Sequence, residues 1–207
     1  EYAVKVNRQE YYAIITHMDH QIGRILDHLK KTKQERNTYI VFTADHGLAV
    51  GHHGLMGKQN MYDHSVRVPF IVVGPDVAKD ATNDSNIYLQ DVMPTTLELA
   101  GMEKPEHVEF HSLLPLLNGE QKESNYPAVY GAYLENQRSV RAFGYKMILY
   151  PTAKKVRLYH LESDPEEAID LSEDPSTADI QKKLFAALLE LQKEMADSLD
   201  LTSTFSF

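Results

Sequence analysis

Two short runs of β-branched and aromatic residues most constrain how this chain folds. They are residues 38–43 (TYIVFT) and 68–73 (VPFIVV). Each run is nearly continuous in apolar side chains rather than alternating, which is typical of a strand buried on both faces. Pro69 comes at the start of the second run, where a missing N–H donor is tolerated. The runs therefore predict two buried strands.

Helical periodicity surrounds these runs. Between residues 8 and 31 apolar side chains recur every three or four positions, which predicts an amphipathic helix. Residues 91–101 (DVMPTTLELAG) predict a short helix, with Pro94 in its first turn and Gly101 as its stop. A helix followed by a buried strand indicates the α/β class.

The character of the chain changes near residue 120. Residues 120–125 are polar and linker-like, so we place a domain boundary there, between residues 1–120 and residues 121–207. Beyond it, short apolar runs at hairpin spacing predict one small antiparallel sheet, with strands at 128–130, 139–143, 146–150 and 156–159. A closing helix is predicted over residues 180–199, with these residues on one face: Leu184, Leu188, Leu191 and Met195.

Composition excludes several classes of function. The 207 residues carry a net charge of −9, which argues against a nucleic-acid partner bound through its phosphates. The absence of cysteine excludes disulfides, thiolate zinc sites and a thiol nucleophile from this chain. No apolar run approaches the roughly 20 residues that cross a bilayer, so we expect a soluble chain with no membrane span.

The triplet Asp45-His46-Gly47 follows directly after the first apolar run. In open α/β sheets, ligands gather outside the carboxyl ends of strands. Asp45 offers hard carboxylate oxygens to a divalent cation, and His46 can ligate a metal or donate a hydrogen bond to an anion. The alternative is a plain turn, in which the aspartate caps neighbouring amides and the glycine supplies a positive φ.

The following loop adds His52, His53 and Lys58. A lysine beside a metal-bound carboxylate indicates a catalytic site if the lysine and the metal act on one anionic group. Cationic donors stabilise the negative charge that develops on such a group in a transition state. Adjacent side chains on an extended loop point apart, so a substrate contact by His53 is favoured over joint metal binding by both histidines. Asp63 and Arg67, four residues apart, predict a structural ion pair.

Taken together, these segments resemble the C-terminal part of a sulfatase of the alkaline-phosphatase superfamily, nearly end to end. The resembling stretches are YYAIITHMDHQIGRILDHL leading to TYIVFTADHG, GHHGLMGKQNMYDHSVRVPFIVVGP, DVMPTTLELAG, and YKMILY with RLYHLESDPEEAIDL. The most specific feature is DHG, a lysine thirteen residues after its aspartate, and then RVPFIVVGP. The resemblance implies the closing part of a mixed-sheet α/β domain, followed by a small antiparallel sheet with a packed terminal helix.

In sulfatases, a formylglycine hydrate made from Cys or Ser in a CxPxR or SxPxR motif attacks sulfur, while calcium polarises the sulfate oxygens. The resemblance implies that Asp45 and His46 complete the calcium site and that Lys58 touches the sulfate as a catalytic group. Calcium prefers oxygen ligands, and many family members have Asn at the position of His46. His46 is therefore either a metal ligand or a catalytic group that bonds the sulfate oxygen or a neighbouring nucleophile.

This chain departs from the family because it contains no cysteine and no SxPxR motif. We therefore expect a fragment that lacks the nucleophile and the N-terminal half of its parent, and that does not hydrolyse sulfate esters by itself. The parent would act on a sulfated small molecule or glycan, and the missing half would complete the calcium site. The fragment's uncovered strands favour self-association. The family further implies a periplasmic or secreted location.

Two other functions stay open. A phosphomonoester or phosphonate hydrolase, or a phosphate-transferring mutase, of the same superfamily also carries a DHG after a strand. Such enzymes commonly hold two transition metals, for which His53 or His64 would have to serve here. A non-catalytic module that binds anionic glycans or a protein needs no nucleophile, although the lysines and arginines of this chain form no basic stripe.

Overall fold

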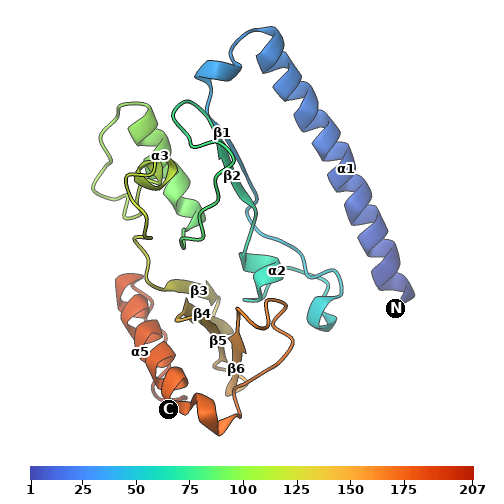
Figure 1. Cartoon of the computed structure of the whole chain (residues 1–207). Coiled ribbons are helices and arrows are strands. Elements are labelled where there is room, and N and C mark those ends of the chain that lie inside the picture. The colour runs from blue at the N-terminus through green and yellow to red at the C-terminus, as the bar shows by residue number, and fades with distance from the viewer.

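The chain forms a long N-terminal helix, a two-stranded sheet with a helix packed on it, and a four-stranded sheet with its own helix (Figure 1). The computed structural model describes all of residues 1–207. Its helices are α1 (Tyr2–Lys31), α2 (Asp63–Val66), α3 (Val92–Leu99), α4 (Leu114–Leu117) and α5 (Ala178–Glu194). Its strands are β1 (Ile40–Thr43), β2 (Phe70–Val73), β3 (Val129–Tyr133), β4 (Gln137–Ala142), β5 (Tyr145–Tyr150) and β6 (Lys155–His160). None of the helices combines the length and the apolar character that crossing a bilayer requires.

Helix α1 ends at the predicted residue but begins six residues earlier than predicted, at Tyr2. Within its N-terminal part, Arg8 Nε donates to the carbonyl oxygen of Val50 at 2.7 Å. The rest of the helix runs alongside the molecule with no buried residue (Figure 1). Its apolar face is uncovered, with Ile14 67% exposed and Ile25 63% exposed.

Strands β1 and β2 pair antiparallel, and the register places Val41 opposite Val72. The prediction that they are buried on both faces is wrong, because Ile71 and Val73 are more than half exposed. This sheet has only two strands and α3 covers one face, where Phe70 and Val72 line a narrow apolar cleft. The other face has no covering layer. Self-association through this exposed apolar surface stays a prediction.

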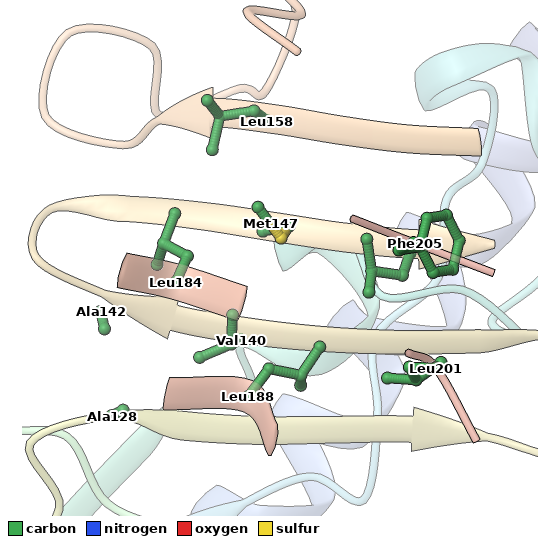
Figure 2. Close-up of a cluster of buried hydrophobic side chains, with 10 residues drawn as sticks. Ala128, Val140, Ala142, Met147, Leu158, Leu184, Leu188, Leu201 and Phe205 are labelled. Carbon is green, nitrogen blue, oxygen red and sulfur yellow. The ribbon is translucent and has the colours of Figure 1, made fainter. Parts of the chain in front are cut away.

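The four-stranded sheet is antiparallel in the order β3-β4-β5-β6, as predicted. The register pairs Val140 with Met147 and Met147 with Leu158, so one row of apolar side chains crosses the sheet. Leu184 and Leu188 of α5 cover this row, and the C-terminal segment adds further apolar side chains (Figure 2). The helix ends at Glu194, five residues before the predicted end, and the chain then folds back over the sheet.

A second buried cluster lies on the opposite face of the four-stranded sheet. Ile148 of β5 and Tyr159 of β6 pack there against Met61 and Tyr62, which precede α2. All four side chains are less than a tenth exposed. The loop between β1 and β2 therefore rests on the C-terminal sheet, across the domain boundary we predict near residue 120, and that boundary stays a prediction.

Candidate functional site

The DHG turn leaves β1 at its carboxyl end, as predicted, and packs against α2. Gly47 N–H donates to the carbonyl oxygen of Ser65 at 2.9 Å. A Cβ atom on Gly47 would lie 2.0 Å from the carbonyl oxygen of His64, which only glycine permits. The requirement for glycine here is this close approach, since Gly47 is not among the residues with positive φ.

The structure brings Asp45, His46 and Lys58 together at this turn. Lys58 Nζ contacts His46 Nε2, and Asp45 Oδ2 lies 3.3 Å from the same nitrogen. Asp45 Oδ1 accepts the backbone N–H of His46 at 3.0 Å. The Asp45 side chain is 82% exposed, so its carboxylate faces solvent and remains accessible to a ligand.

The partners of His46 indicate its tautomer. Nδ1 lies 3.1 Å from the carbonyl oxygen of Gly47, which can only accept, so Nδ1 carries the proton. When Nε2 carries no proton, its lone pair faces the ammonium group of Lys58, which can only donate, while the carboxylate of Asp45 lies 3.3 Å from the same nitrogen. A metal ion would compete with Lys58 for that lone pair. In this arrangement His46 orients Lys58, and Asp45 is the better-suited metal ligand.

The residues of this turn fit only part of a calcium site. Calcium takes about six to eight oxygen ligands, and the exposed carboxylate of Asp45 is a suitable one. The chain contains no group of three or more His, Asp or Glu side chains that could hold a metal ion. A calcium ion at Asp45 would therefore need most of its ligands from elsewhere.

His53 takes a different position from the other predicted site residues. Its ring stacks on Tyr62, with ring centroids 4.0 Å apart and an interplanar angle of 10°. The adjacent His52 points instead toward Glu166, with Nδ1 3.8 Å from Oε2. No hydrogen bond or ion pair joins His53 to Asp45, His46 or Lys58, so a substrate contact by His53 stays a prediction.

His64 lies in the same aromatic group and stays neutral near physiological pH. Its ring centroid is 5.6 Å from that of His53 and 5.7 Å from that of Tyr62. Burial, together with the charges that His53 and His52 can carry, lowers the pKa of His64 to about 4. Its Nε2 atom is buried with no hydrogen-bond partner.

Asp63 forms the predicted ion pair with Arg67 at 3.8 Å, but its closer partners lie on the C-terminal sheet. Arg141 Nη1 is 3.0 Å from Asp63 Oδ2, and Lys146 Nζ contacts Asp63 Oδ1. Burial alone would raise the pKa of Asp63, but the charges and hydrogen bonds of Lys146 and Arg141 hold that pKa below its ordinary value. Asp63 therefore stays ionised.

Glu167 completes a buried charge cluster that sequence reasoning missed. Its Oε2 atom accepts the backbone N–H of Asp63 at 2.6 Å, and its Oε1 atom lies 2.6 Å from Lys146 Nζ. The contact of Oε1 with Lys146 is one of opposite charges without hydrogen-bond geometry. Glu167 is 2% exposed and Lys146 is 3% exposed, so this pair is closed to solvent.

Gln137 is a second residue that sequence reasoning missed. Its Oε1 atom accepts the N–H of Met61 at 3.2 Å, and its Nε2 atom donates to the carbonyl oxygen of Gln59 at 3.2 Å. Between these two residues, Asn60 N–H donates to the carbonyl oxygen of Lys58 at 2.8 Å. The first residue of β4 therefore bonds the backbone of Gln59, the residue that directly follows Lys58.

Comparison with known proteins decides the family. Residues 51–194 match the family described as N-sulphoglucosamine sulphohydrolase, C-terminal. The chain belongs to the sulfatase family. An N-acetylglucosamine-6-O-sulfatase of Bacteroides thetaiotaomicron is 31% identical to it over 92% of this chain and 36% of the relative. The expected sulfatase resemblance and mixed α/β fold are thereby confirmed.

Solved structures agree with this membership. BT4656 in complex with its substrate D-glucosamine-2-N,6-O-disulfate has a TM-score of 0.82 and 30% identity, over 89% of this chain and 40% of that chain. A phosphonate monoester hydrolase from Silicibacter pomeroyi has a TM-score of 0.74 and 25% identity, over 85% of this chain and 38% of that chain. This sulfatase-family chain thus spans about a third of the length of the curated relatives it matches.

Proposed function

We propose that this chain supplies the Asp45, His46 and Lys58 part of the active site of a sulfate ester hydrolase. The observation that carries the proposal is the meeting of an exposed carboxylate and an ammonium group around one imidazole, at the carboxyl end of β1. The names of the relatives support a sulfated carbohydrate or small molecule as the substrate class. The nucleophile, a formylglycine, would come from residues outside this chain.

Each of the three residues has a role that its contacts support. Lys58 donates hydrogen bonds to a sulfate oxygen and stabilises the negative charge that develops there. His46, protonated at Nδ1, holds the ammonium group through its Nε2 lone pair. Asp45 presents its carboxylate to calcium. When bound, calcium would polarise the sulfate oxygens as a Lewis acid.

The 207-residue chain alone should not turn over an aryl sulfate. It contains no cysteine and no SxPxR motif. Its candidate metal site offers one exposed carboxylate, and no group of three ligating side chains is present. Turnover of a generic aryl sulfate by the purified chain would contradict this part of the proposal.

The similarity to a phosphonate monoester hydrolase supports a second candidate function, the hydrolysis of a phosphonate or phosphate monoester. The same ammonium group would serve a phosphoryl oxygen equally well. Metal content separates the two candidates, because the sulfatase proposal needs one calcium ion and the alternative commonly needs two transition-metal ions. Paired assays with an aryl sulfate and an aryl phosphonate give a second, independent distinction.

The test compares Lys58→Ala with Lys193→Ala in a longer protein that carries this segment and turns over substrate. Removing a donor to the developing charge should lower kcat by about 10² to 10³. Lys193, whose exposed side chain pairs only with Glu190, should leave kcat unchanged. Asp45→Asn should lower the amount of calcium bound per molecule of protein. Full activity of Lys58→Ala would refute the proposal, and turnover of the phosphonate alone, with two transition metals bound, would replace it.

A further inference from the structure

We propose that Gln137 is a positioning residue for Lys58, through which the C-terminal sheet sets the place of the ammonium group. The inference rests on the proposed function, since it concerns how Lys58 is held for that reaction. It gives the small sheet a part in the chemistry, although no hydrogen bond or ion pair joins a side chain of that sheet to Asp45, His46 or Lys58.

The side-chain amide of Gln137 makes two hydrogen bonds with backbone groups, as the backbone of a neighbouring strand would. Its oxygen accepts from Met61 N–H and its NH2 group donates to Gln59 C=O, each at 3.2 Å. These two backbone groups flank Asn60, whose own N–H donates to the carbonyl oxygen of Lys58. Asn60, Met61 and Gln137 are all less than a tenth exposed, so water does not satisfy the N–H groups of Asn60 and Met61 in the folded chain.

A second anchor holds the other end of the same segment. Tyr62 and Met61 pack on Ile148 and Tyr159, and Asp63 N–H donates to the buried carboxylate of Glu167. The segment from Gln59 to Asp63 is therefore held near both ends, by Gln137 of β4 and by Glu167 of the loop that follows β6. On the side of β1, the adjoining chain is held by backbone bonds from Ala49 N–H to the carbonyl oxygen of Gly57 and from Gly51 N–H to that of Leu55.

Gln137→Met keeps the length of the side chain and removes both hydrogen bonds. Met61 N–H would then be buried without a partner, and the segment would have to shift to reach another acceptor or water. Lys58 moves with it, away from His46. A misplacement of about 1 Å at a catalytic group can lower the rate about 10²-fold.

Gln181→Met is the matched control. Gln181 is as buried as Gln137, at 8% exposed, and its Nε2 atom donates to Ser172 O at 3.1 Å and Thr177 Oγ1 at 2.9 Å. It lies on α5 and bonds only to residues near it in sequence. Both variants lose two buried hydrogen bonds, but only Gln137→Met releases the segment that carries Lys58.

The experiment measures kcat and KM for both variants, each alone and combined with Lys58→Ala, in the longer protein. We expect Gln137→Met to lower kcat about 10²-fold. In the Lys58→Ala background the same substitution should change kcat less than threefold, because the group it positions is gone. Gln181→Met should leave kcat unchanged in both backgrounds. A Gln137→Met effect that is equal in both backgrounds, or matched by Gln181→Met, would overturn the inference.

Amide hydrogen exchange at Asn60 provides a readout that does not depend on turnover. Gln137→Met should raise its exchange rate at least tenfold, while Gln181→Met should not change it. Unchanged exchange at Asn60 in Gln137→Met would overturn the positioning role even in an inactive protein. If the unmodified protein hydrolyses no sulfate ester while exchange responds as expected, the proposed function fails and the structural positioning stands.

Discussion

Replacing Lys146 by methionine should remove the only cation that contacts Glu167. In the folded chain, Lys146 Nζ contacts Asp63 and lies 2.6 Å from Glu167 Oε1. Methionine fills a similar volume, so the main effect is the loss of charge. Breaking a buried ion pair by removing one partner costs about 3–5 kcal/mol of folding free energy. Arg141 still compensates Asp63 at 3.0 Å, so Glu167 is the group left uncompensated.

The assay is urea denaturation at pH 7, followed by far-UV circular dichroism. The double variant Lys146→Met/Glu167→Gln should recover most of the lost stability, because a glutamine oxygen can still accept the N–H of Asp63. The control is Lys193→Met, which removes a pair whose lysine side chain is 72% exposed and should change stability by no more than about 0.5 kcal/mol.

Two results would refute this reasoning. One is a loss of less than about 1 kcal/mol in Lys146→Met, the size expected for an exposed pair. The other is a double variant no more stable than the single one. The stabilities of the unmodified protein and of Lys146→Met should also respond differently to acid. The lowered pKa of Asp63 contributes stability above the ordinary carboxyl value, which is lost as pH falls toward the folded pKa, and this dependence should weaken in Lys146→Met.

Three further predictions concern single residues. Gly47→Ala should lower the free energy of unfolding by about 1–3 kcal/mol, because its Cβ would overlap a backbone oxygen, whereas Gly23→Ala, with open space around it in α1, should raise it by up to about 1 kcal/mol. Equal thermal shifts of both variants would contradict this. His64 should titrate near pH 4 by NMR; its neutral form contributes stability that is complete above about pH 6.5 and is lost as pH falls toward 4, and titration near 6.5 would contradict the burial argument. Leu188→Ala should cost about 2–5 kcal/mol in chemical denaturation, and a loss below about 1 kcal/mol would mean that α5 does not form the core.

The small sheet could be predicted from sequence because its pattern is local. Short apolar runs at hairpin spacing predicted β3 to β6, and a helical stripe predicted α5. The burial of β1 and β2 could not be predicted in the same way. A continuous apolar run shows what a strand is able to bury, but whether a layer covers Ile71 and Val73 depends on tertiary structure.

The residues of the candidate site likewise divide into those with local contacts, which sequence could predict, and those with long-range contacts, which it could not. Asp45 and Lys58 could be found because a strand end and a short loop bring them together within thirteen residues. Gln137, Lys146 and Glu167 contact partners that are 78, 83 and 104 residues away along the chain. Pairings at such separations leave no local periodicity. In the sequence, Lys146 is indistinguishable from an exposed lysine on a strand, and only the fold shows that it is buried.

The distance between Asp63 and Glu167 also sets an order of events during translation. Glu167 is synthesised 104 residues after Asp63, a delay of about 5–20 s at typical elongation rates of about 5–20 residues per second. Until Glu167 is synthesised, Asp63 lacks the carboxylate that accepts its backbone N–H. On the positioning role we propose for Gln137, a nascent chain interrupted before β4 would carry Asp45, His46 and Lys58 without the side chain that holds the backbone next to Lys58.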